Sequence, residues 1–248
     1  MYRQAITQYL HTHGHQHINL KSVLFDMDGV LFDSMPNHAN AWHKAMKAHD
    51  LDLSFEEAYL HEGRTGADTI NIICQRQLNR EASPEEIETM YHDKTVAFNK
   101  YPLAERMPGT KELLRKLKDT GVISTVVTGS GQSSLLERLE GSYPGLFHLE
   151  LMVSAFDVKY GKPHPEPYLM ALTKGSWAIN EAIVIENAPL GVEAGVKAGI
   201  FTIAVNTGPL ADKVLTDAGA DLLFPSMQAL ADAWKELYAE FNKVRNMV

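Results

Sequence analysis

The stretch "VLFDMDGVLFDS", residues 23–34, opens on an apolar run and changes character at two aspartates. The run Val-Leu-Phe at 23–25 predicts a buried strand, because a strand covered on both faces is continuously apolar. Asp26 and Asp28 follow directly, spaced so that both carboxylates face the same way from the strand end. A strand suited to the core therefore displays two carboxylates at its end, and their purpose is the first question that the sequence raises.

The composition favours one core domain with a smaller insertion. The chain has 248 residues, which is long for one domain and short for two full-sized ones. Hydrophobic residues make up 45%, enough for a sizeable core. Lysine and arginine number 23 against 31 aspartates and glutamates, a formal charge of −8. This balance argues against nucleic acid or an anionic membrane as the main partner.

Cysteine usage and hydropathy indicate a cytoplasmic protein. Cys74 is the single cysteine, so an intrachain disulfide is impossible and a reducing compartment is expected. We interpret it as a buried packing thiol among isoleucines. No segment approaches the apolar length of a membrane span, and the N-terminus lacks the order of a signal peptide.

From residue 21 the chain alternates short apolar runs with helical patterns, which predicts an α/β fold with a doubly wound parallel sheet. The helical patterns close on glycine, the ordinary helix stop, at Gly121, Gly141, Gly175 and Gly199. Six strands are predicted, at residues 22–26, 122–128, 151–154, 182–186, 201–206 and 221–224.

Two segments depart from this alternation. Residues 36–99 contain no convincing strand, and Ser54 and Ser83 each begin a helix of the capping-box type, so we expect a helical cap inserted into the core. Residues 1–20 form an N-terminal extension whose alternating histidines, in "HTHGHQH", we interpret as a solvated connector rather than a metal site. The predicted core comprises residues 21–35 and 100–248.

Polar residues collect where the predicted strands end. In an open parallel sheet, ligands bind beyond the carboxyl ends of the strands, so these residues should share one crevice. The positions are Asp26 and Asp28 after the first strand, Thr128, Gly129 and Ser130 in "VVTGSG", Lys162 in "YGKPHPEP", and Glu186 with Asn187 in "IVIENAPLG".

This inventory suits phosphoryl transfer, although each motif alone is weak. Asp26 can attack phosphorus and form an acyl phosphate, and Asp28 can act as general acid and then as base. The hydroxyls and N–H groups of the "TGS" turn and Lys162 would bind phosphate oxygens. Mg²⁺ prefers hard oxygens, and the candidate ligands are Asp26, the Asp28 backbone carbonyl, Glu186 and the Asn187 side-chain oxygen.

The motifs "DMDGVLFDS", "VVTGS", "GKPHPEPY" and "VIENAPLGVEAGVKAG" resemble the haloacid dehalogenase superfamily, and in particular its β-phosphoglucomutase-like group. They span residues 21 to 206 and are together highly specific. The resemblance implies a Rossmann-like core with a helical cap. It also implies Asp26 as nucleophile, Asp28 as acid and base, Thr128 and Lys162 on the phosphate, and Mg²⁺ as cofactor.

Departures from the group's pattern narrow the expected function. Asn187 stands where the group usually has a second acid. In the cap stretch "HEGRTGAD", Glu62 stands at the mutases' lysine position and Gly66 at their arginine position, with Arg64 out of register. We hypothesise that Glu62 completes the Mg²⁺ environment in place of the missing acid.

The pattern is closest to the inorganic pyrophosphatase branch of the group. Pyrophosphate needs no sugar-binding residues, and Arg64 would hold the leaving phosphate while Lys162 and Mg²⁺ hold the transferred one. His38, on the first cap helix, matches a position near the cap hinge and the substrate. We therefore expect a monomer acting on pyrophosphate or another small phosphorylated substrate.

Other functions stay open. A β-phosphoglucomutase or a small sugar-phosphate phosphatase would use the same core residues. A dinucleotide-dependent oxidoreductase is favoured only by "GSGQSS", which lies after the wrong strand and lacks the expected acid. A non-catalytic binding module would have no need to keep both Asp26 and Asp28.

Overall fold

Five parallel strands form one sheet in the computed structural model, which describes residues 1–129 and 135–245. The order is β2-β1-β3-β4-β5. β2 is therefore added on one side of β1, and β3, β4 and β5 are added on the other side. This is the switch point at which parallel sheets open a crevice, and the α/β fold predicted from the sequence is confirmed. The strands are β1 (Ser22–Phe25), β2 (Ile123–Val126), β3 (Ala182–Glu186), β4 (Phe201–Val205) and β5 (Leu222–Phe224).

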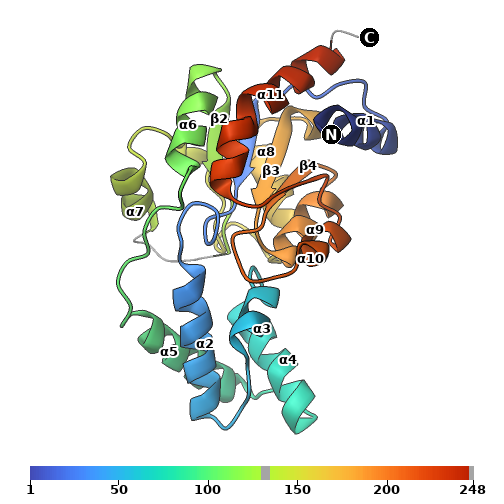
Figure 1. Cartoon of the computed structure of the whole chain (residues 1–248). Coiled ribbons are helices and arrows are strands. Elements are labelled where there is room, and N and C mark those ends of the chain that lie inside the picture. Colours follow the sequence, from blue (N-terminus) through green and yellow to red (C-terminus); the bar gives the residue numbers. More distant parts are fainter. Residues whose placement is uncertain (130–134, 246–248) are drawn as a thin grey trace.

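Helices cover both faces of this sheet (Figure 1). Phe25 of β1 packs in one cluster with Leu113 and Trp234, and its neighbour Leu24 packs in another with Tyr168. Alternate residues of a strand point to opposite faces, so β1 is buried on both. The core helices are α1 (Tyr2–His13), α6 (Thr110–Asp119), α7 (Leu135–Ser142), α8 (Glu166–Gly175), α9 (Pro189–Lys197), α10 (Asp212–Asp217) and α11 (Met227–Arg245).

The strand predicted at residues 151–154 is wrong. Leu149–Leu151 form a short 3₁₀ helix, and Val153 makes only an isolated bridge with Val127. The backbone N–H and hydroxyl of Ser154 both donate to the carboxylate of Asp157, which turns the chain before a strand can extend. The stop predicted at Gly141 is also wrong, because α7 continues to Ser142.

Four helices stand apart from the sheet as a separate layer, which we call the cap (Figure 1). They are α2 (Met35–Ala48), α3 (Phe55–Leu60), α4 (Gly66–Leu78) and α5 (Pro84–Phe98). The Ser54 side chain accepts a hydrogen bond from the Glu57 N–H, and Ser83 forms the predicted capping box with Glu86. Cys74 is buried in the cap's own apolar cluster, as expected.

The N-terminal segment packs on the core more closely than the sequence indicated. Ile6, Tyr9 and Leu10 are buried in the main cluster, and the Tyr9 hydroxyl donates to the Gly199 carbonyl at 2.8 Å. Ile18 is buried too, so the solvated connector is only partly confirmed. Among the described helices, none combines the length and the apolar character needed to cross a membrane.

Candidate active site

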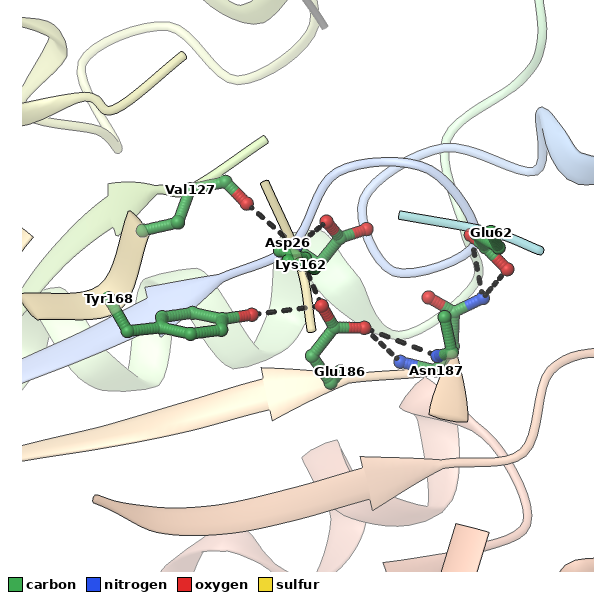
Figure 2. Close-up of polar contacts among 8 residues, drawn as sticks. Asp26, Glu62, Val127, Lys162, Tyr168, Glu186 and Asn187 are labelled. Carbon is green, nitrogen blue, oxygen red and sulfur yellow. Dashed lines mark hydrogen bonds and ion pairs between the residues drawn. The ribbon is translucent and has the colours of Figure 1, made fainter. Parts of the chain in front are cut away.

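A buried lysine joins the ends of two neighbouring strands (Figure 2). The Lys162 ammonium donates to the Asp26 carboxylate, to Glu186 Oε1 at 2.6 Å and to the Val127 carbonyl at 3.1 Å. Its side chain is 1% exposed, which leaves its three protons with three protein acceptors and none for water. Lys162 therefore ties Asp26, just past β1, to Glu186, the last residue of β3.

Glu186 is committed to protein partners through both oxygens. Oε1 accepts from Lys162 and from the Tyr168 hydroxyl at 2.9 Å, while Oε2 accepts from the backbone N–H groups of Asn187 and Ala188 at 2.9 and 3.2 Å. These four donors occupy the lone pairs that a carboxylate offers. A metal ion would have to displace one of them, so we propose that Glu186 positions Lys162 rather than binds metal directly.

Asp28 is held from the side of the cap. The Ser34 hydroxyl donates to Asp28 Oδ1, and His38 Nε2 lies 3.5 Å from the same oxygen. Lys94, buried on α5, donates to His38 Nδ1 at 3.1 Å. Because an ammonium only donates, His38 Nδ1 must accept, which places the ring proton on Nε2, facing Asp28.

Burial and neighbouring charges set the pKa values of the two aspartates in opposite directions. Burial, with the charge of Glu186, raises the pKa of Asp26 to about 8, although Lys162 opposes this. Burial also acts to raise the pKa of Asp28, but His38 and the Ser34 hydrogen bond outweigh it and lower that pKa well below its usual range. Taken alone, these directions would favour a protonated Asp26 and an ionised Asp28; a cation beside Asp26 and a phosphate beside Asp28 would shift the two pKa values the other way.

One turn of the cap, at Glu62 and Gly63, contacts the site residues Asn187 and Lys162. Asn187 Nδ2 donates to both oxygens of Glu62, at 3.1 and 3.0 Å (Figure 2). The adjoining Gly63 lies against Lys162, because a Cβ built on it would be 3.3 Å from the lysine side chain. Burial, with the charges of Asp26 and Glu186, raises the pKa of Glu62 well above its usual value.

Asn187 leaves one atom without a partner. Its Oδ1 is buried and accepts no hydrogen bond from any described residue, while its Nδ2 is taken by Glu62. The loop backbone approaches closely here, since a Cβ on Gly29, whose φ is +78°, would lie 2.1 Å from Nδ2. A glycine at position 29 is therefore required for this amide to sit beside the Asp28 loop.

The remaining predicted site residues are Thr128, Gly129, Ser130 and Arg64. Thr128 is buried beyond β2, and its N–H donates to the Val153 carbonyl at 2.9 Å. Gly129 is exposed and lies close to the cap turn, because a Cβ built on it would be 3.7 Å from the Gly63 carbonyl oxygen. Ser130 lies outside the described residues. Arg64 is half-buried, and its Nε has no hydrogen-bond partner within the described part of the chain.

Sequence reasoning missed Lys94 and Tyr168. Both are buried, and Lys94 lies 5.1 Å from the centre of the Phe98 ring and 5.5 Å from that of Trp42. Burial lowers the pKa of Lys94 to about 8, with Asp28 opposing. Lys94 is 56 residues from His38 in the chain, so no local pattern joined them. The one signal in the sequence was that Lys94 occupies a position on the apolar face of its helix, where a lysine is uncommon.

Comparison with known proteins places these strand ends in a family context. The family model described as "Haloacid dehalogenase-like hydrolase" matches residues 23–205. Hexitol phosphatase A of Escherichia coli (strain K12) is 31% identical over 186 residues, which are 75% of this chain and 83% of that protein. The phosphorylated carbohydrates phosphatase of Thermotoga maritima is 28% identical over 202 residues, 81% of this chain and 92% of that one.

A solved structure resembles the chain over nearly its full length. It is a Bacteroides vulgatus protein, provisionally described as a beta-phosphoglucomutase, with 61% sequence identity and a TM-score of 0.93. The match covers 97% of this chain and 98% of the other. The similarity therefore extends through the cap and the N-terminal helix as well as through the core.

Proposed function

Because the chain belongs to the haloacid dehalogenase-like hydrolase family, we propose that it is a Mg²⁺-dependent phosphohydrolase with Asp26 as the nucleophile. The observation that carries this proposal is the pairing of a buried Asp26, bonded to Lys162, with an Asp28 held two residues away by Ser34 and His38. Covalent catalysis by a carboxylate needs such a nucleophile and such a proton donor.

The residues present fit a magnesium ion. Asn187 Oδ1 is a buried oxygen that lacks a hydrogen-bond partner among the described residues, which is what a metal ligand looks like without its metal. With the Asp26 carboxylate and the Asp28 carbonyl it would form a set of hard oxygens. The described residues include no cluster of three or more His, Cys, Asp or Glu side chains with metal-site spacing, but an amide and a carbonyl do not count in such a cluster. Bound Mg²⁺ would offset the charge of the phosphoryl oxygens.

The chemistry then divides between the two aspartates. Asp26 attacks phosphorus, the bond from phosphorus to the leaving oxygen breaks, and Asp28 gives that oxygen its proton. Asp28 next takes a proton from water, which attacks the aspartyl phosphate and releases phosphate and Asp26. Asp28 has a lowered pKa without substrate, and the negative charge of an incoming phosphate favours the proton that the first step needs. We assign Thr128 and Lys162 to the phosphoryl oxygens, and Lys162 would bind one by exchanging one of its three protein acceptors for it.

For the leaving group, the cap turn favours a small anion and supports inorganic pyrophosphate as the substrate. Glu62 and Gly63 lie directly on Asn187 and Lys162, so the cap turn covers the residues assigned to the metal and the transferred phosphate. Arg64 Nε, next to them in the chain, is buried and lacks a hydrogen-bond partner among the described residues. We propose that this guanidinium, together with Glu62 acting through the metal environment, serves the second phosphate.

A phosphorylated sugar or polyol is the second candidate, and the named relatives favour it over pyrophosphate. The Escherichia coli and Thermotoga maritima proteins are described as phosphatases of a hexitol and of carbohydrates. The Bacteroides vulgatus structure adds a sugar-phosphate mutase as a variant of the same chemistry. These names concern those proteins, while the Glu62–Asn187 contact belongs to this chain.

Phosphate release distinguishes the candidates. The purified chain is assayed with Mg²⁺ on pyrophosphate, on a panel of hexose and hexitol phosphates, and on β-glucose 1-phosphate with a bisphosphate primer. Asp26→Asn serves as the inactive reference. Fast release from pyrophosphate alone supports the first candidate, and release from the sugar phosphates supports the second. Isomerisation without release would establish a mutase, and no turnover of any of them would overturn the proposal.

A further inference from the structure

Helix α7 and the residue after it contact the loop that carries Asp28. The guanidinium carbon of Arg138 lies 3.8 Å from the centre of the Phe32 ring, and the Tyr143 hydroxyl donates to the Leu31 carbonyl. Phe32 closes this loop, because its carbonyl accepts from the Gly29 N–H at 2.8 Å. Arg138 of α7 and Tyr143, the residue after this helix, therefore both contact the Asp28 loop.

The same arginine also holds a connection to the cap. Arg138 Nη2 donates to the Ala104 carbonyl at 3.3 Å, in the linker from α5 back to the core. This linker runs beside the other one, since the Asp33 N–H donates to Glu105 and the Met107 N–H donates to Leu31, both at 2.9 Å. The two linkers thus form a short antiparallel pair, and Arg138 is bonded to one strand of it while it stacks on Phe32 of the other.

Arg138 forms no ion pair within the described part of the chain, and Asp28 is the carboxylate whose charge acts on it. The side chain is half-buried, and burial lowers its pKa. An unpaired, partly buried guanidinium is an unfavourable way to fill space, because an apolar side chain would pack there without the cost of desolvation. Its planar fork, however, can stack on a ring and donate to a carbonyl at the same time.

We propose that Arg138 is a positioning residue, which fixes the Asp28 loop and the cap linkers in one arrangement so that the acid–base group meets Asp26 when the cap lies on the core. This inference rests on the proposed function for its catalytic consequence. The contacts of Arg138 are with Phe32 and Ala104, and its charge also helps to lower the pKa of Asp28. A displacement of about 1 Å in a catalytic group can lower a rate by roughly a hundredfold.

Arg138→Met and Arg138→Lys test the proposal, with Arg106→Gln as the matched control. Arg106 is exposed and donates from the same linker to the Ser142 carbonyl of α7 at 3.2 Å, but its side chain has no recorded ring contact with Phe32. The first readout is amide hydrogen exchange at Asp33 and Met107, which needs no substrate. The second is kcat and KM for whichever phosphate compound the wild-type chain hydrolyses.

In Arg138→Met we expect exchange at both amides to rise about tenfold or more while the strands β1 and β3 keep their protection. We also expect kcat to fall roughly tenfold to a hundredfold with KM within about twofold. Lysine can still donate and lie over the ring, so Arg138→Lys should recover most of both losses. Unchanged exchange and kcat, or exchange that rises equally in the sheet, would overturn the proposal. If the wild-type chain hydrolyses no phosphate compound, the proposed function fails while the exchange data still decide the coupling.

Discussion

The side-chain nitrogen of Asn187, Nδ2, donates hydrogen bonds to both carboxylate oxygens of Glu62. These bonds join the end of β3 to the cap turn. This contact orients the amide and leaves Oδ1 without a partner among the described residues. The orientation matters, because only Oδ1 can bind a cation. A carboxylate from the cap thus decides which atom the core presents to the predicted metal site.

The direction of this hydrogen bond can be reversed by mutation. In Asn187→Asp two carboxylates face one another, so we expect the contact to break and kcat/KM to fall at least tenfold. In the double variant Asn187→Asp with Glu62→Gln, the glutamine amide donates to the new aspartate. That variant should recover a substantial part of the loss. Steady-state kinetics of the two single variants and the double variant measure the coupling, and strictly additive losses would contradict it.

Glu62 should contribute to Mg²⁺ affinity. Outer-sphere partners of a metal site typically change affinity by roughly 10–100-fold, so we expect Glu62→Ala to bind Mg²⁺ at least tenfold more weakly. Glu56→Gln, an exposed change on α3, the helix that precedes this turn, removes the same formal charge and is the control. Titration calorimetry with Mg²⁺ provides the measurement. Equal affinities in Glu62→Ala and the wild-type chain under turnover conditions would rule out this role.

Lys94 should lower the stability of the folded chain and raise its activity. Its pKa in the folded chain is about 8, below the ordinary 10.5. Below pH 8 the folded and unfolded chains both carry this proton, and the full cost of burying the charge is present. Between pH 8 and 10.5 only the unfolded chain keeps the proton, so the free energy of unfolding rises with pH. Lys94→Met should therefore be more stable by about 1–3 kcal/mol at pH 7.

Two observations check this prediction. Urea unfolding of both chains should show the stability gain at pH 7 shrinking as pH rises from 8 to 10.5. The kcat of Lys94→Met should fall, because His38 Nδ1 loses the donor that sets its ring proton. A gain that does not vary with pH would show that Lys94 is not the titrating group.

Gly191 should be intolerant of any side chain. A Cβ there would lie 1.8 Å from Glu186 Oε1, the atom that accepts from Lys162 and Tyr168. We expect Gly191→Ala to lower the free energy of unfolding by about 2–4 kcal/mol and kcat more than tenfold. Gly141→Ala, inside α7 with no atom within 4 Å of its Cβ, should instead stabilise by up to about 1 kcal/mol. Similar effects of the two changes would contradict the account of Glu186.

Local sequence patterns predicted the parts of this fold that depend on local chemistry. The apolar run before Asp26 and the capping serines Ser54 and Ser83 form the elements expected of them. The residues around Val153 are apolar like those of a strand, but the turn between Ser154 and Asp157 stops a strand from forming there. A short helix was expected near the N-terminus, but its packing on the core was not, although Ile6, Tyr9 and Leu10 lie on one helical face.

The sequence predicted the site residues at the strand ends and, in the cap, Glu62 and His38, but not Lys94 or Arg138. Asp26 and Glu186 meet because the carboxyl ends of parallel strands share one edge, a rule that sequence order can apply. Lys162 joins them from the loop after Val153, where the predicted strand does not form. The contacts of Lys94 with His38 and of Arg138 with Ala104 join segments whose relative position depends on tertiary packing. The roles of the site residues stay predictions until they are measured.

The central claim is that Asp26 carries the phosphoryl group. The most direct test is rapid acid quench during turnover with Mg²⁺ and the best substrate, followed by peptide mass analysis. We predict one added phosphoryl group on the peptide that contains Asp26, lost at alkaline pH as an acyl phosphate is, and no such adduct in Asp26→Asn. Turnover at a normal rate by Asp26→Asn, or a phosphoryl group found on another residue, would contradict the account.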